Sequence, residues 1–110
     1  MNFRTTRIYR VAIELIDVVA GVIRGLPSGY GALGDQLRRA ASSVALNYLE
    51  GCGRTGTAER RRFFVIATGS ALEVAGIFDV LGRFGAVSPA ERALGLDRCD
   101  HLAAMLRRFR

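Results

Sequence analysis

Residues 57–85 constrain the fold most, because this stretch has the length of a long helix and is apolar on nearly every side. Its apolar side chains are Phe63, Phe64, Val65, Ile66, Ala67, Leu72, Val74, Ile77, Phe78, Val80 and Leu81. A helix that is hydrophobic all round is buried on more than one side. The small residues Gly69, Ser70, Ala75 and Gly76 predict a close helix crossing. The stretch therefore indicates a domain in which one helix packs against several others.

Three further helices are predicted from the periodicity of the apolar residues, and no alternation of Val, Ile and Thr indicates a strand. The first covers about residues 4–24, and the second about residues 30–52. The fourth begins with the capping-box pattern Ser88–Glu91, with proline at the first helical position. We expect the hydroxyl of Thr57 to cap the third helix. The apolar stripe of the first helix is formed by Ile8, Val11, Leu15, Val18 and Val22.

The predicted connections are short, so neighbouring helices are expected to run antiparallel. The sequence thus predicts an all-α, up-down-up-down four-helix bundle in which residues 1–110 form a single domain. The glycine-rich segment at residues 51–56 resembles a phosphate-binding loop only superficially. It lacks the G-K-[ST] motif and follows a helix rather than a strand, which indicates a turn between helices.

Half of the residues are hydrophobic and the mean hydropathy is +0.20, which is high for so small a domain. Such an excess of apolar surface is covered by a membrane or by an oligomer interface. Glu14 and Asp17 interrupt the first apolar segment, and Glu73 and Asp79 interrupt the third. No apolar run reaches the ~20 residues of a spanning helix. We therefore expect a homo-oligomer in the cytoplasm and no membrane partner.

The second predicted helix carries a narrow polar stripe. At about 100° per residue, its members fall within an arc of about 80°. They are Gln36, Arg39, Ser43, Asn47, Glu50 and Arg54. Apolar residues flank the stripe on both sides, which favours contact with another helix or subunit over a solvated face. The stripe is therefore interpreted as a polar lock, in which Glu50 and Arg54, four residues apart, pair with each other.

Catalysis and metal binding are not expected. Ser42, Ser43 and His101 have no recognisable triad spacing, so no catalytic residue is assigned. Cys52 and Cys99 form no C-x-x-C pair and a second histidine is lacking, so neither a metal site nor a cofactor is predicted. Cys99 has the spacing of a small core residue, and a disulfide is not expected in the cytoplasm.

All 16 basic residues are arginine, and the net charge is +6. A GC-rich coding bias explains the absence of lysine, but guanidinium groups also bind phosphate and stack on bases. Every quarter of the chain is mildly positive, with two local clusters. They are Arg60, Arg61 and Arg62, and Arg107, Arg108 and Arg110. The clusters are candidate phosphate contacts or solvated helix ends. Tyr9, Tyr30 and Tyr48 are not interleaved with arginines, so specific recognition of single-stranded bases is not expected.

Two motifs carry a family resemblance. Residues 36–54 read Q-L-R-R-A-A-S-S-V-A-x-N-x-x-E-G-x-G-R, and residues 57–73 read T-A-E-R-R-R-F-F-V-I-A-T-G-S-A-L-E. Together they resemble the 23S rRNA intervening-sequence proteins, and are similar to the accessory variability determinant of diversity-generating retroelements. The resemblance implies a small, all-helical, pentameric protein without catalytic activity that binds nucleic acid. Tyr48 and Leu49 stand where Ile-Ala is usual, and Cys52 stands where an aromatic residue is common.

Two functions remain open from the sequence. The first is a non-enzymatic oligomer that binds RNA or DNA through its arginines. The second is a structural or adaptor protein that binds itself and a protein partner such as a reverse transcriptase. The charge favours the first function, and the excess of apolar surface favours the second.

Overall fold

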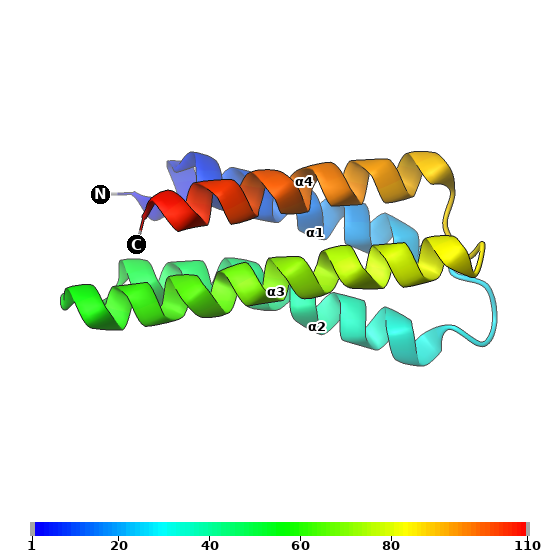
Figure 1. Cartoon of the computed structure of the whole chain (residues 1–110), viewed down its shortest axis with the longest axis horizontal. Coiled ribbons are helices and arrows are strands. Elements are labelled where there is room, and N and C mark those ends of the chain that lie inside the picture. Colours follow the sequence, from blue (N-terminus) through cyan, green and yellow to red (C-terminus); the bar gives the residue numbers. More distant parts are fainter. Residues whose placement is uncertain (1, 110) are drawn as a thin grey trace.

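The structure, a computed structural model, describes residues 2–109, and its regular elements within that range are helices joined by short loops, without strands (Figure 1). A short 3-10 turn precedes four α-helices. The elements are η1 (Phe3–Thr5), α1 (Arg7–Gly25), α2 (Gly31–Cys52), α3 (Thr57–Arg83) and α4 (Pro89–Arg108). The prediction of an all-α chain with four helices is confirmed, with boundaries within a few residues of those expected.

The helix caps agree with the sequence prediction at α4 and differ at α3. Ser88 accepts a hydrogen bond from the backbone N–H of Glu91, and the Glu91 carboxylate accepts one from the backbone N–H of Ser88. This reciprocal pair is the predicted capping box. At α3 the N-cap is Gly56, and no side chain caps the helix. The predicted cap by Thr57 is wrong, because Thr57 is already the first residue of the helix.

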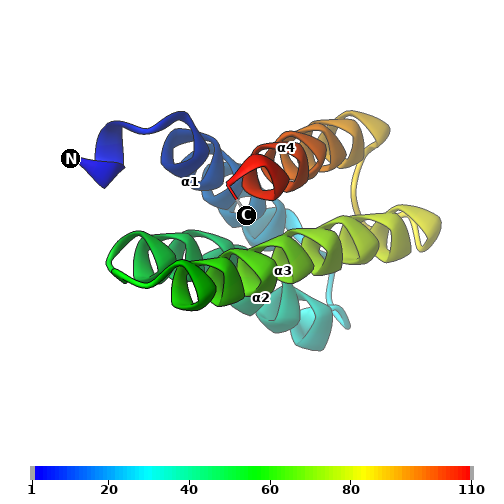
Figure 2. The ribbon, with the colours of Figure 1, turned by 60° about the vertical axis from the view of Figure 1, so that its left-hand side comes forward.

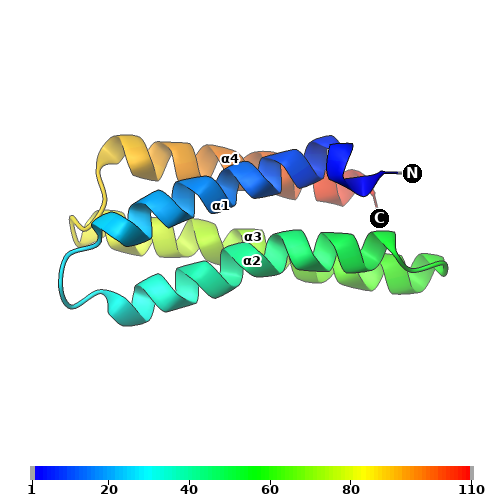
Figure 3. The same ribbon diagram turned by 180° about the vertical axis from the view of Figure 1, so that it is seen from behind.

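Each helix packs against the next one along the chain, and α4 returns to contact α1. The Tyr48 hydroxyl near the end of α2 meets Thr6 just before α1, and Asp79 near the end of α3 meets Arg92 near the start of α4. Such contacts pair the start of one helix with the end of its neighbour. The body measures 45 × 21 × 18 Å. The α2–α3 turn lies at the same end as both chain termini (Figures 1 and 3).

The core runs along the middle of the four helices. Its largest fully buried side chains are Tyr48, Phe64, Phe78, Leu15, Leu37, Leu81, Leu102 and Leu106. The predicted stripe of α1 is buried at Ile8, Val11, Leu15 and Val22, while Val18 is only half-buried. Tyr48 stacks on Phe64 with ring centroids 5.7 Å apart. Its hydroxyl donates a hydrogen bond to Oγ1 of Thr6 at 2.9 Å, so the polar end of this buried ring has a partner.

Close helix contacts occur at glycines other than those predicted. A Cβ built on Gly51 would lie 2.5 Å from the Phe64 ring, and one built on Gly95 would lie 2.6 Å from the Phe78 ring. Aromatic rings of α3 therefore pack directly on the backbones of α2 and α4. The predicted crossing at Gly69, Ser70, Ala75 and Gly76 holds only in part, because the Ser70 hydroxyl lies 2.7 Å from that of Ser43 on α2, while a Cβ at Gly69 or Gly76 would meet nothing within 4 Å.

The outer face of α3 is apolar and uncovered in the single chain. Opposite the buried side of this helix, Val65, Leu72 and Val80 are exposed together with the two outward glycines, and Leu72 has 54% of its surface exposed. The helix is long and apolar enough to cross a membrane by length and composition alone. Its inner face, however, supplies much of the bundle core.

Candidate nucleic-acid interface

Arginines from three separate segments of the chain gather at one end of the bundle. We define the basic end as residues 2–10, 50–63 and 104–109, which lie at the end that carries both termini and the α2–α3 turn (Figures 1 and 2). Its arginines are Arg4, Arg7, Arg10, Arg54, Arg60, Arg61, Arg62, Arg107 and Arg108. The acidic residues in these segments are Glu50 and Glu59. The basic end therefore has a strongly positive net charge.

The remainder of the bundle has the opposite balance. Its arginines are Arg24, Arg38, Arg39, Arg83, Arg92 and Arg98. Its acidic residues are Glu14, Asp17, Asp35, Glu73, Asp79, Glu91, Asp97 and Asp100, which outnumber the arginines. Several of these charges are paired, as in the contact of 2.6 Å between Arg92 and Asp79. The net charge of the protein is thus concentrated at the basic end. Sequence reasoning missed this concentration, because the charge is spread evenly along the chain.

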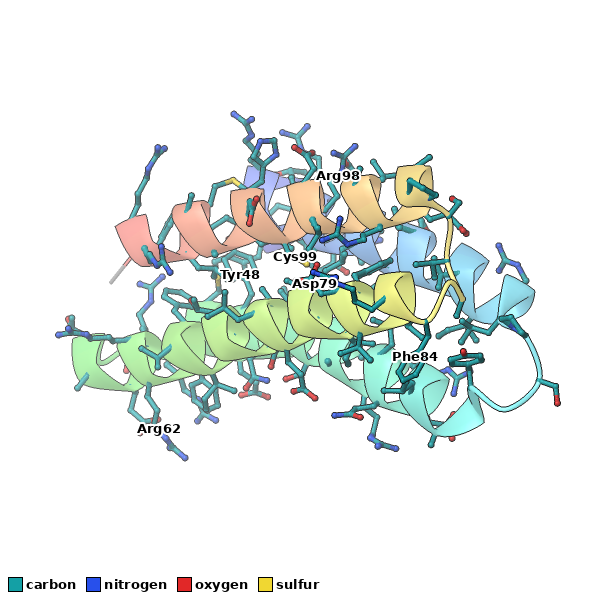
Figure 4. All side chains as sticks on the ribbon, turned by 45° about the vertical axis from the view of Figure 1, so that its right-hand side comes forward. Tyr48, Arg62, Asp79, Phe84, Arg98 and Cys99 are labelled. Carbon is teal, nitrogen blue, oxygen red and sulfur yellow. The ribbon has the colours of Figure 1, made fainter. Side chains whose placement is uncertain are left out.

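The two predicted arginine clusters both lie at the basic end. Arg61 and Arg62 are exposed and Arg60 is half-buried, as expected for successive positions on one helix. Arg107 and Arg108 at the end of α4 are also exposed, while Arg110 lies outside the described residues. Figure 4 shows Arg62 pointing away from the bundle. The fold therefore brings together clusters that are more than forty positions apart in the sequence.

Ion pairs neutralise part of the basic end. Arg54 lies 3.0 Å from Glu50 and 4.0 Å from Glu59, and Arg62 lies 3.8 Å from the other oxygen of Glu59. These side chains are about half exposed, so each pair contributes little to stability. Within residues 2–109, these two carboxylates are the ones found within 4.0 Å of a basic-end arginine. The remaining guanidinium groups are available for phosphate.

Phenylalanine side chains lie among these arginines. The guanidinium of Arg54 is 5.0 Å from the centre of the Phe63 ring, and that of Arg62 is 5.5 Å from it. Phe109 follows Arg107 and Arg108 and has 55% of its surface exposed. Sequence reasoning examined the tyrosines and missed this arrangement. The signal that marks it is the adjacency in R-R-R-F-F and R-R-F.

The polar stripe of α2 lies along its seam with α3 for part of its length. Gln36 donates a hydrogen bond to Glu73 at 3.3 Å, and the hydroxyls of Ser43 and Ser70 are 2.7 Å apart. The amide of Asn47 donates to both the backbone oxygen and the hydroxyl of Ser43 at 2.9 Å. Gln36 and Ser43 therefore lie at the contact between α2 and α3, while Asn47 bonds to Ser43 within α2.

The other members of the stripe are open to solvent. Arg39 is exposed, and the paired side chains of Glu50 and Arg54 are 56% and 47% exposed. The predicted pair of Glu50 and Arg54 is confirmed at 3.0 Å, but its side chains are not buried between helices of the single chain, and contact with another subunit stays a prediction. The reason is the position of Glu50 on α2, beside the outward Leu46 rather than toward the core.

The buried titratable groups give no sign of a reactive centre. Burial raises the pKa of Cys99 from 9.0 to about 12, with a smaller contribution from the charge of Asp100. Burial also raises the pKa of Tyr48, against the opposing effect of its hydrogen bond with Thr6. Both groups stay protonated at neutral pH, and both point between the helices (Figure 4). Among the described residues, no three His, Cys, Asp or Glu side chains are grouped to hold a metal ion.

Comparisons with known proteins agree with this helical architecture. A family model described as 23S rRNA-intervening sequence protein matches residues 4–108. No curated protein matches the chain. A crystal structure of a protein of unknown function from the S23 ribosomal protein family of Bacteroides thetaiotaomicron is similar in fold, with a TM-score of 0.83. The similarity covers 90% of this chain and 94% of that one at 15% sequence identity.

Proposed function

The chain belongs to the 23S rRNA-intervening sequence protein family, and from that premise we propose that it is a non-enzymatic, cytoplasmic homo-oligomer whose basic end binds RNA or DNA. The supporting observation is the gathering of arginines from three segments of the chain at one end of the bundle, while acidic residues outnumber arginines elsewhere. A localised positive potential attracts a polyanion and raises the rate at which it associates.

Phosphate is the chemical group that the basic end is suited to bind. Guanidinium groups donate paired hydrogen bonds to phosphate oxygens and stay charged at every physiological pH. Phosphate contacts fix the position of a nucleic acid without reading its sequence. Binding is therefore expected to be largely independent of sequence and to weaken steeply as salt is raised, because phosphate contacts release condensed cations.

Self-association is proposed through the outer face of α3. Val65, Leu72 and Val80 form an exposed apolar strip there, and Gly69 and Gly76 leave room for a second helix to approach closely. A second copy of this antiparallel bundle is the proposed occupant, and the family resemblance suggests a ring of five. A rotation axis parallel to the bundle would place every basic end on one side of the ring. One polymer chain would then contact several copies, and avidity would strengthen weak single contacts.

A salt titration with a matched pair of variants tests the binding proposal. The affinity for generic RNA and DNA is measured for the parent and for the triple replacement of Arg60, Arg61 and Arg62 by Gln. The control replaces Arg24, Arg38 and Arg83 by Gln, which changes the net charge equally outside the basic end. The first variant is expected to bind more weakly and with a flatter dependence on salt. The control is expected to retain most of the affinity. Equal losses in the two variants would contradict a localised interface.

The alternative function is that of an adaptor for a protein partner such as a reverse transcriptase. The observation that favours it is apolar exposure away from the outer face of α3. Phe84 has 67% of its surface exposed, and Leu94 on α4 is also exposed. Contact between copies through α3 would leave these side chains uncovered. If the parent binds no nucleic acid even at low salt, the adaptor function replaces nucleic-acid binding as the proposal.

A further inference from the structure

Phe109 presents an aromatic surface to solvent inside the basic end. Its ring centroid lies 6.2 Å from that of Phe64, with the ring planes at 81°. Phe64 itself is fully buried, and its ring stacks on the ring of Tyr48. Phe109 is therefore anchored to the core by a perpendicular contact while 55% of its surface remains exposed. Hydration of this exposed surface is unfavourable, so an apolar or aromatic ligand that covered it would gain free energy.

The surroundings of Phe109 limit what that ligand is. Arg107 and Arg108 precede it directly, and the α3 arginines belong to the same end of the bundle. A ligand that covers the ring must therefore also tolerate or neutralise several guanidinium groups. Phe63 shows that guanidinium groups already lie over an aromatic ring at this end, at 5.0 and 5.5 Å. Proteins bind single strands by stacking the bases on aromatic side chains and by neutralising the phosphates with cationic side chains.

We infer that the basic end binds single-stranded nucleic acid, with an unpaired base stacked on Phe109 and its phosphates held by neighbouring arginines such as Arg107 and Arg108. The inference rests on the proposed function and specifies the form of the polymer. A duplex offers the same phosphates, but its bases are already stacked on one another and cannot cover the ring without being extruded. Stacking accepts every base, so this preference for unpaired strands does not require sequence recognition.

The test compares an unstructured oligouridylate with a blunt-ended, loop-free duplex that has the same number of phosphates. Fluorescence anisotropy gives the affinity of each probe for the parent, Phe109→Leu and Phe84→Leu over a series of salt concentrations. Leucine retains an apolar contact with Phe64 but removes the aromatic face. Phe84 is the matched control, because it is even more exposed but lies outside the basic end (Figure 4). Circular dichroism and the sedimentation profile confirm that each variant keeps its fold and assembly.

The parent is expected to prefer the single strand. Phe109→Leu is expected to lose roughly 5- to 100-fold of its affinity for the single strand, the range for one stacked base. Its affinity for the duplex and the slope of log affinity against log salt should stay near those of the parent, since the phosphate contacts remain. Phe109→Trp should restore binding of the single strand. Phe84→Leu should match the parent with both probes.

Three results would overturn the inference in distinguishable ways. Equal affinity of the parent for both probes, with no effect of Phe109→Leu, removes the stacking site but leaves the proposed nucleic-acid binding intact. If Phe109→Leu weakens the affinity for the single strand and for the duplex equally, the ring only positions the arginines of α4. Failure of the parent to bind either probe at low salt removes the proposed function itself, and the inference with it.

Discussion

At the residue scale, the thiol of Cys99 couples folding to pH in a defined window. Burial raises its pKa from 9.0 to about 12, so the folded protein keeps a proton that the unfolded chain releases. The free energy of unfolding should therefore be unaffected by this group below pH 9 and should fall as the pH rises from 9 toward 12. The contribution is about 1.4 kcal/mol per pH unit. Urea unfolding of the parent and Cys99→Ala across this window measures it.

Burial also raises the pKa of Tyr48 above its ordinary value of 10.0, so the folded protein holds the phenol proton more tightly than the unfolded chain does. The parent therefore loses stability from two groups, and Cys99→Ala retains only the effect of Tyr48. The replacement also leaves a small cavity, but that cost does not change with pH. The decisive quantity is the difference between parent and variant, which should shrink above pH 9. A difference that stays constant up to pH 12 would contradict the raised pKa.

Glycine positions provide a second prediction at the residue scale. An added Cβ at Gly95 would lie 2.6 Å from the fully buried ring of Phe78, so the ring or the helix would have to shift. Gly95→Ala should destabilise the protein by about 1–3 kcal/mol, as overpacking does. At Gly21, near the C-terminal end of α1, the nearest atom would be the Arg24 guanidinium at 3.9 Å. Gly21→Ala should instead stabilise the protein by about 0.5–1 kcal/mol through helix propensity. Thermal unfolding of both variants separates the two effects by sign.

At the scale of the element, the starts of α3 and α4 should respond differently to the same substitution. Ser88→Ala removes a side chain that accepts from the backbone N–H of Glu91, and should cost about 1 kcal/mol. Thr57→Ala should change the free energy of unfolding by less than about 0.5 kcal/mol, because Gly56 is the N-cap and no side chain caps this helix. Urea unfolding curves test both variants. If Thr57→Ala lowered the free energy of unfolding as much as Ser88→Ala, the Thr57 hydroxyl would be the cap of α3 that the sequence predicted.

The four helices could be predicted because periodicity, glycine-rich turns and the Ser88–Glu91 capping box are local signals. The contacts between helices could not be predicted in the same way, because they depend on residues that are distant in sequence. The spacing of Gly69 and Gly76 shows that they share a face, but not whether that face meets another helix of the same chain, and within the single chain it meets none. The basic end is formed by residues that are distant in sequence, so even charge along the chain concealed it. The same holds for Phe63, whose position between Arg54 and Arg62 depends on the α2–α3 turn.

At the scale of the whole molecule, charge is distributed unevenly along the 45 Å length of the bundle. The basic end carries exposed arginines and Phe109, and the remainder carries acidic residues that outnumber its arginines. The exposed apolar strip on the outer face of α3 lies along the side of the bundle, so copies that associate through it leave both ends open. The basic end and the apolar strip of α3 therefore occupy different parts of the molecule, and we expect that a substitution in one leaves the other in place.

Leu72→Arg tests the apolar strip of α3 separately from the basic end. It places a charge in the middle of the apolar strip of α3, at a residue that is 54% exposed in the single chain. The variant should keep its helical circular dichroism, because surface substitutions change stability little. It should sediment near the single-chain mass of 11.9 kDa, whereas the parent should be several times larger. Leu94→Arg, on the exposed side of α4, is the control and should assemble like the parent.

The same variant separates assembly from binding. In the single-chain form each basic end still offers its arginines, so the affinity for an oligonucleotide too short to reach a second copy should be unchanged. The affinity for a long RNA should fall by about 10²-fold or more, because avidity requires several sites on one particle. A parent that already sediments near 11.9 kDa at micromolar concentration would contradict the assembly. In that case Leu72→Arg should bind long and short RNA as the parent does, and the basic end of a single bundle would be the whole interface.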